Sequence, residues 1–350
     1  MSDFIGSIYE WFSKNKRELP WRKTKDPYKI WLSEIILQQT RINQGTKYYS
    51  SFIEEFPTVK DLAAASEDKI LKLWQGLGYY SRARNLHFTA KHISNKLDGK
   101  FPEDYESIIK LKGIGAYTAA AIASIAFDLP YPTVDGNIYR VLSRYFGIST
   151  PIDTTLGKKK FYEVAKEIIE QCADPGFHNQ SLMEFGALQC TPKSPDCINC
   201  PIAVSCFARK NDQINELPVK SKKQKQIKRY FNYYYIDNGE FTYLQKRTGN
   251  DIWKNLFQFP LAESEKLLTD DEVLNYNVPF LNGVKINIKN ILKIQKHILS
   301  HQIIYARVIQ VETSGLNNFP ENFIQVNKKD ISKFAVSRLM EQFITELNIG

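Results

Sequence analysis

Four cysteines lie within one short segment, and their spacing limits the possible folds of this chain more than any other feature. Cys190, Cys197, Cys200 and Cys206 are separated by six, two and five residues. In a reducing compartment such a group indicates a metal site rather than disulfides. Four thiolates can hold a [4Fe–4S] cluster. A zinc site is the alternative, but zinc more often lies between two Cys-x-x-Cys pairs, and the segment has one such pair, so the spacing favours the iron–sulfur cluster.

The composition indicates a folded protein with a polyanionic partner. The chain has 350 residues, 43% apolar content and a formal net charge of +9, which predicts two or three domains. Nucleic acid is the first candidate partner, because neutralised phosphates release counterions, although many unrelated proteins are mildly basic. No signal peptide is visible, and the longest run of small apolar residues, 118–127, is too short to span a membrane. We expect a cytoplasmic protein.

The chain divides by composition into two parts. Helical periodicity with glycine and proline punctuation predicts an all-α domain over residues 1–211, with helices at residues 31–48, 69–73, 81–97, 118–127, 137–146 and 158–172. Residues 212–228 are polar and rich in lysine, which is typical of a basic linker. Residues 229–350 form an α+β domain in this interpretation, with a closing helix near residues 333–346 and strands at residues 229–237, 240–247, 255–261 and 302–312.

Two glycines, Gly113 and Gly115, precede a helix of small residues. Glycine permits a tight turn, and the N–H groups at the start of the following helix can bind a phosphate oxygen. The pattern is similar to a helix-hairpin-helix motif that binds the DNA backbone. A plain turn between two helices gives the same pattern, so both interpretations stay open at this point.

Two carboxylates are candidate catalytic groups. Glu34 lies among apolar residues in WLSEIILQQT, and desolvation by such neighbours raises a carboxyl pKa toward the range that a general acid needs. An ordinary surface glutamate on an amphipathic helix is the alternative. Asp135 directly precedes an amphipathic helix, where its simplest role is an N-cap.

The order of these motifs resembles the endonuclease III superfamily of DNA glycosylases over residues 1–210. Within it the MutY-type adenine DNA glycosylases are most similar, through LPWR at 19–22, SEIILQQT at 33–40 and GLGYYSRARNL at 76–86. The resemblance implies a helix-hairpin-helix glycosylase domain that carries one [4Fe–4S] cluster. Its six-helix module would lie near residues 23–132, and its cluster module would combine residues 1–22 and 133–211.

The resemblance also implies roles for individual residues. Glu34 would protonate adenine N7, and Asp135 would stabilise the oxocarbenium-like sugar or a covalent intermediate. Tyr117 replaces the catalytic lysine of endonuclease III, which implies a monofunctional enzyme. Tyr117 and Asn137 would both assist at the sugar and the catalytic water. The base pocket would contain Arg22, Leu37 and Gln180. The remaining expected DNA contacts are Gln39, Thr40, Tyr79, Gly113 and Gly115.

The second domain resembles a Nudix-like domain that recognises 8-oxoguanine opposite the adenine. Relatives use a Phe-Ser-His loop for this, and the chain has Leu299, Ser300 and His301, so the expected aromatic is replaced by leucine. The carboxylate signature of Nudix hydrolases is absent from the sequence, which predicts recognition without hydrolysis.

The function implied is excision of adenine mispaired with 8-oxoguanine or guanine in duplex DNA, by a monomer that is associated with the nucleoid in a bacterial cell. Two other functions stay open at this point. One is a bifunctional pyrimidine glycosylase of the endonuclease III type, and the other is a non-catalytic iron–sulfur module that binds DNA.

Overall fold

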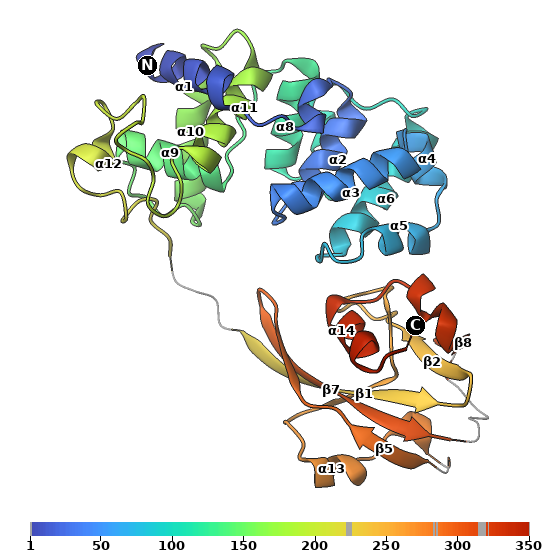
Figure 1. Ribbon diagram of the computed structural model, residues 1–350. Helices are drawn as coiled ribbons and strands as arrows, with labels where there is room; N and C mark the ends of the chain where they lie inside the picture. Colours follow the sequence, from blue (N-terminus) through green and yellow to red (C-terminus); the bar gives the residue numbers. More distant parts are fainter. Residues whose placement is uncertain are drawn as a thin grey trace. The chain divides into compact units, whose positions relative to one another are not determined.

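The computed structural model describes residues 2–221, 226–282, 284, 286–313, 320 and 322–349 (Figure 1). It divides into two compact units. The first unit combines Met1–Ala64 with Asn85–Lys222, and the second combines Ala65–Arg84 with Lys223–Gly350. Part of the expected linker, residues 222–225, lies outside the described residues.

The described part of the first unit consists of helices and loops, as the sequence predicts. None of its helices, nor any other among the described residues, combines the length and apolarity that a membrane crossing needs. The helices are α1 (Ser2–Asn15), η1 (Pro20–Lys23), α2 (Pro27–Leu37), α3 (Ile42–Glu55), α4 (Val59–Ala64), α6 (Ser81–Lys96, which begins in the second unit), α7 (Tyr105–Ile108), α8 (Ala116–Phe127), α9 (Gly136–Phe146), α10 (Thr155–Ile169), α11 (Pro175–Leu188) and α12 (Phe207–Lys210).

The prediction of a single helix over residues 31–48 is wrong, because the chain forms α2 and α3 with a break between them. Gln39 lies in the break with a φ of 56°, in the left-handed region that interrupts a right-handed helix. Thr40 closes this turn by donating its backbone N–H to the Leu37 carbonyl at 3.1 Å. The break places an exposed loop directly after the helix that carries Glu34.

Helix α11 packs closely against two other helices through glycines. A Cβ at Gly176 would lie 2.8 Å from the Ser124 carbonyl oxygen in α8, and one at Gly186 would lie 2.7 Å from Cβ of Asn137 in α9. Larger side chains at these positions would clash with backbone or with a short side chain. Helix α11 therefore packs against the C-terminal part of α8 and the start of α9, and the start of α9 carries the predicted residues Asp135 and Asn137.

The second unit contains two β-sheets and short helices. One sheet has the order β4-β1-β7-β5 with β6 on β7, and the other has the order β3-β2-β8. The strands are β1 (Ile227–Asp237), β2 (Phe241–Lys246), β3 (Phe257–Gln258), β4 (Leu261–Ser264), β5 (Asn287–Ile291), β6 (Gln295–Ile298), β7 (Gln302–Glu312) and β8 (Phe323–Asn327). The helices are α5 (Glu67–Leu73), α13 (Asp270–Leu274), η2 (Pro279–Leu281), η3 (Lys328–Lys333) and α14 (Arg338–Glu346).

The central strands of the larger sheet are buried. Strands β1 and β7 run parallel with Tyr233 opposite Val308, and Leu339 and Phe343 of α14 pack into the same apolar cluster. Tyr233, Tyr234 and Tyr235 are each 2% exposed or less, so these aromatic rings belong to the core. An α+β second domain is therefore confirmed.

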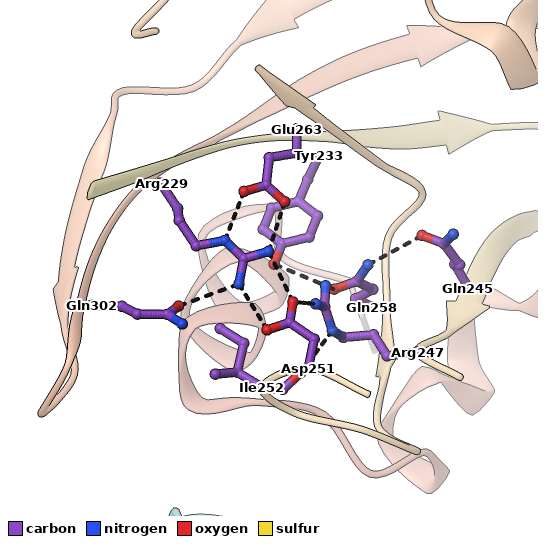
Figure 2. Close-up of polar contacts among 9 residues, drawn as sticks. All are labelled: Arg229, Tyr233, Gln245, Arg247, Asp251, Ile252, Gln258, Glu263 and Gln302. Atoms are coloured by element: carbon purple, nitrogen blue, oxygen red, sulfur yellow. Dashed lines mark hydrogen bonds and ion pairs between the residues drawn. The ribbon is translucent and has the colours of Figure 1, made fainter. Parts of the chain in front are cut away.

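A network of charged side chains joins the starts of β1 and β7 (Figure 2). Arg229 donates to Glu263 at 2.7 Å, to Asp251 at 2.9 Å and to Gln302 at 3.3 Å. Arg247 donates to the other oxygen of Asp251 at 2.7 Å. The two positive and two negative charges balance one another. One end of the network is Gln302, directly after the turn of residues 299–301, and the other branch runs through Gln258 to Gln245.

Candidate active site

A cavity of about 650 Å³ in the first unit brings together predicted site residues from four helices. Glu34 comes from α2, Tyr117 from the start of α8, Asp135 and Asn137 from the start of α9, and Gln180 from α11. The other predicted residues that line it are Arg22, Leu37, Gln39, Thr40 and Gly115. This volume lies within the range of about 300–1,000 Å³ that is usual for ligand sites.

Glu34 is a buried carboxyl group, only 8% exposed, so its interpretation as a surface residue is wrong. Burial raises its pKa to about 7, and the charge of Asp135 acts in the same direction, while a hydrogen bond from Tyr117 opposes both. Helix α2 is buried on nearly every side, which explains why an ionisable group here loses its hydration. A carboxyl group with this pKa can donate a proton near neutral pH.

Tyr117 lies between the acid and the opposite wall of the cavity. Its hydroxyl hydrogen-bonds Glu34 and contacts the sulfur of Met183 at 3.3 Å. Burial, together with the nearby carboxylates, raises the pKa of Tyr117 well above its ordinary value. The phenol therefore stays protonated, and its hydroxyl, which donates to the Met183 sulfur, lies beside the acid.

Asp135 is the N-cap of α9, as predicted, and it also lines the cavity. One oxygen accepts from the backbone N–H groups of Asn137 and Ile138 at 2.9 and 2.8 Å, and the other accepts from the Asn137 side chain at 2.7 Å. Burial raises its pKa, and these hydrogen bonds oppose that rise. Arg140 holds Asn137 in turn, at 2.9 Å, so the carboxylate has a fixed orientation.

Two charged residues that line the cavity were missed at the sequence level, Arg17 and Glu184. Glu184 is 2% exposed and accepts hydrogen bonds from the side chains of both Arg17 and Arg22. It lies one helical turn after Gln180 on α11, so spacing alone places both on one face of that helix. The position of this glutamate on the same helix face as a predicted pocket residue was the signal that could have placed Glu184 in the cavity.

Gly113 and Gly115 form the turn before α8. Gly113 has a φ of 82°, a conformation that favours glycine, and a Cβ there would lie 2.6 Å from Cβ of Asn85. Gly115 is the N-cap of α8 and provides no capping side chain, and the space beside its Cα is open. This geometry can bind a phosphate oxygen.

The four clustered cysteines line one small cavity of about 30 Å³. Burial raises the pKa of Cys200 to about 11, and the charges of the other three thiols act in the same direction. The Arg144 guanidinium lies 3.4 Å from the Cys190 sulfur. Among the described residues, no three His, Cys, Asp or Glu side chains are arranged as ligands of a metal ion. The four thiols nevertheless share one site beside a buried cation, which fits an anionic iron–sulfur cluster.

The remaining predicted residues lie in the second unit. Tyr79 is 48% exposed, with a φ of 45°, in the turn between α5 and α6. Ser300 and His301 are exposed in the turn between β6 and β7, and the Ser300 hydroxyl lies 3.1 Å from Nδ1 of His301. Leu299 instead packs partly against the apolar core of the unit. The turn therefore presents two polar side chains to solvent.

The chain matches two family models. Residues 32–171 match the HhH-GPD superfamily base excision DNA repair protein, and residues 232–346 match the NUDIX domain. An adenine DNA glycosylase of Buchnera aphidicola subsp. Schizaphis graminum is 38% identical over 321 residues, which cover 90% of this chain and 89% of the relative. The chain belongs to the adenine DNA glycosylase family. The family and the two-domain fold predicted from the sequence are thereby confirmed, and the enzyme is a base-excision repair hydrolase of N-glycosyl bonds.

Other relatives match the helical part. The human adenine DNA glycosylase is 40% identical over 223 residues, 61% of this chain and 41% of the human protein. A solved structure of a thermostable thymine-DNA glycosylase has a TM-score of 0.55 at 30% identity, over 59% of this chain and 95% of that one. An endonuclease III–DNA complex has a TM-score of 0.51 at 23% identity, over 59% of this chain and 94% of that one, which is a likeness of fold.

Proposed function

We propose that this adenine DNA glycosylase hydrolyses the N-glycosidic bond of adenine mispaired with 8-oxoguanine or guanine in duplex DNA. The observation that carries the proposal is the pairing of a buried carboxyl, Glu34, with a fixed carboxylate, Asp135, in one cavity. Glycosidic hydrolysis uses one carboxyl group as acid and a second one to stabilise the positive sugar. An adenine extruded from the duplex would enter this cavity.

Each residue has a distinct role in the proposed reaction. Glu34 donates its proton to adenine N7, which makes adenine a neutral leaving group. The Asp135 carboxylate, fixed by its hydrogen bonds to α9, stabilises the oxocarbenium-like sugar. Tyr117 occupies the position of the endonuclease III lysine, and a phenol does not form a Schiff base, so the proposed enzyme leaves an abasic site without strand cleavage.

Release of adenine from three duplexes tests this function. We expect excision of adenine opposite 8-oxoguanine and opposite guanine, and no excision opposite thymine. The abasic product should stay uncut until alkali is added. Adenine retained in all three duplexes by folded, iron-loaded protein would show that the chain binds DNA without this chemistry.

The rate of excision should depend on pH through Glu34. The acid acts in its protonated form, and its pKa is raised to about 7, so kcat/KM should fall as the pH rises above about 7. The pH profile of adenine release, measured with A:G duplexes between pH 5 and 9, provides the check. A rate that stays constant up to pH 9 would contradict the role of Glu34 as the acid.

The turn of residues 299–301 is proposed to read the base opposite the adenine. Ser300 and His301 are exposed and hydrogen-bonded to each other, while backbone bonds from Leu299 to Gln302 and from Ile227 to His301 hold the turn. His301 can donate to or accept from an 8-oxoguanine edge. Loss of the preference for 8-oxoguanine over guanine in His301→Ala, with excision from A:G unchanged, is the result that supports this role.

The cysteine site is proposed to hold one [4Fe–4S] cluster through Cys190, Cys197, Cys200 and Cys206. Four thiolates are the ligand set of such clusters, and the buried Arg144 beside Cys190 balances their negative charge. Proton donation at Glu34 needs no electron transfer, so the cluster orders the loop of residues 190–206. Iron and acid-labile sulfide in the purified protein measure its presence. The expected monomeric state and cytoplasmic, nucleoid-associated location stay predictions.

A further inference from the structure

Glu184 is the acceptor of an unusually dense set of hydrogen bonds at the wall of the cavity. Arg17 donates to it from its backbone N–H at 2.9 Å and from its side-chain Nε at 2.9 Å, and its Nη2 binds the second oxygen. Arg22 donates to both oxygens, at 3.0 Å each. A single buried carboxylate therefore fixes two guanidinium groups that lie far from it in sequence.

The carboxylate is ionised and its orientation is fixed. Burial alone would raise the pKa of Glu184, but hydrogen bonds from Arg17 and Arg22 lower it to about 2. The cluster of one carboxylate and two guanidinium groups therefore keeps a net positive charge. Arg22 also donates to the Arg17 carbonyl at 2.9 Å and lies over the Phe12 ring, which limits its rotation further.

Both guanidinium groups line the same cavity as Glu34. The Arg22 side chain is 14% exposed and that of Arg17 is 33% exposed, so each reaches the open space. An arginine has five N–H donors, and within the described residues three from Arg22 bind Arg17 and Glu184. Donors of Arg22 thus stay available to a ligand with hydrogen-bond acceptors.

We propose that Glu184 is a positioning residue that presents Arg17 and Arg22 to ring-nitrogen acceptors of the extruded adenine. This inference rests on the proposed function and deepens it. Adenine has acceptors at N1 and N3 in addition to N7, so fixed donors can hold these nitrogens while Glu34 protonates N7. Guanine carries an N–H donor at N1, which an arginine donor disfavours.

Precise orientation matters here because the reaction needs N7 near the acid and the sugar near Asp135. A shift of about 1 Å in a bound substrate can lower a rate by about 10²-fold. Without the Glu184 charge the two guanidinium groups repel each other and lose their common anchor. The base would then still enter the cavity, but in orientations that do not place N7 at the acid.

The test compares wild type and Glu184→Gln on duplexes that carry adenine, 1-deazaadenine or 3-deazaadenine opposite 8-oxoguanine. Single-turnover rates of base release are measured for each. The ratio of variant to wild type for each base cancels the intrinsic reactivity of the analogue, as in a double-mutant cycle. Glu163→Gln, which changes an exposed glutamate of α10, is the matched control.

We expect Glu184→Gln to lower the rate with adenine by about 10²-fold and the rate with at least one analogue by less than about 10-fold. The affinity of Glu184→Gln for the duplex should equal that of wild type, and Glu163→Gln should release each base at the wild-type rate. If Glu184→Gln does not fold, Glu184→Asp takes its place, because it keeps the charge but cannot reach both arginines, and the same selective loss is expected.

A uniform fall for all three bases would show a purely structural role and overturn the inference, as would no fall at all. Neither result affects the proposed function, which the wild-type rate on adenine tests separately. A wild type that releases no adenine would refute that function first.

Discussion

Glu34→Gln is expected to lower the single-turnover rate of adenine release by about 10³-fold, because the amide has no acidic proton to give to N7. The substitution preserves shape, and the site is buried in α2, so the cavity should keep its form. The affinity for the duplex should stay within a few-fold of wild type, since contacts with the DNA phosphates dominate it. Quenched-flow release of adenine and a binding titration measure the two quantities.

The same variant also tests the burial of Glu34 without reference to activity. The pKa of Glu34 is raised from 4.5 to about 7 in the folded state, so its contribution to stability is full below pH 4.5 and is lost as the pH rises through 7. Above pH 8 this loss is about 3 kcal/mol. Unfolding free energy should therefore fall less with pH in Glu34→Gln than in wild type. Glu10→Gln, at an exposed position, should equal wild type in the rate of adenine release and in the pH dependence of unfolding.

Asp135→Asn is the second substitution with a large expected effect, a loss of about 10³-fold in excision. It removes the negative charge that would stabilise the sugar cation. Asparagine caps helices about as well as aspartate, so α9 should keep its first turn and the free energy of unfolding should change by less than about 1 kcal/mol. Excision rates measure the contribution of the Asp135 charge, and urea unfolding measures its contribution as a helix cap.

A matched control exists at another helix start. Asp104 caps α7 and accepts from the Ser107 N–H at 2.8 Å, and it is exposed. Asp104→Asn should leave both excision and unfolding unchanged. Equal loss of activity in the two variants, or full activity in Asp135→Asn, would contradict the proposed role of Asp135.

Much of the fold follows from local patterns in the sequence. The aromatic and β-branched segments predict β1, β2 and β7, because a strand needs such residues on buried faces. The break between α2 and α3 could not be predicted, since it depends on the left-handed backbone of Gln39. Helix α11 was also missed: it is buried on several sides, so its apolar residues do not follow one helical face.

The candidate site was predicted mainly through family resemblance. Periodicity shows Glu34 among apolar residues, but nothing local indicates that Asp135 lies in the same cavity. The contacts of Glu184 with Arg17 and Arg22 join residues more than 160 positions apart, at the two ends of the helical domain. Such pairs leave no local pattern, and only the folded chain brings them together.

Gln39 and Tyr79, two exposed residues that are predicted to contact DNA, share a backbone property. Both have positive φ values, 56° and 45°, which cost about 1–2 kcal/mol each for a residue with a side chain. Glycine would relieve this strain at either position. Selection for thermostability alone would therefore favour glycine at both positions and would remove two side chains that are predicted to contact DNA. We therefore expect a variant with glycine at both positions to be more heat-resistant and to bind DNA less well.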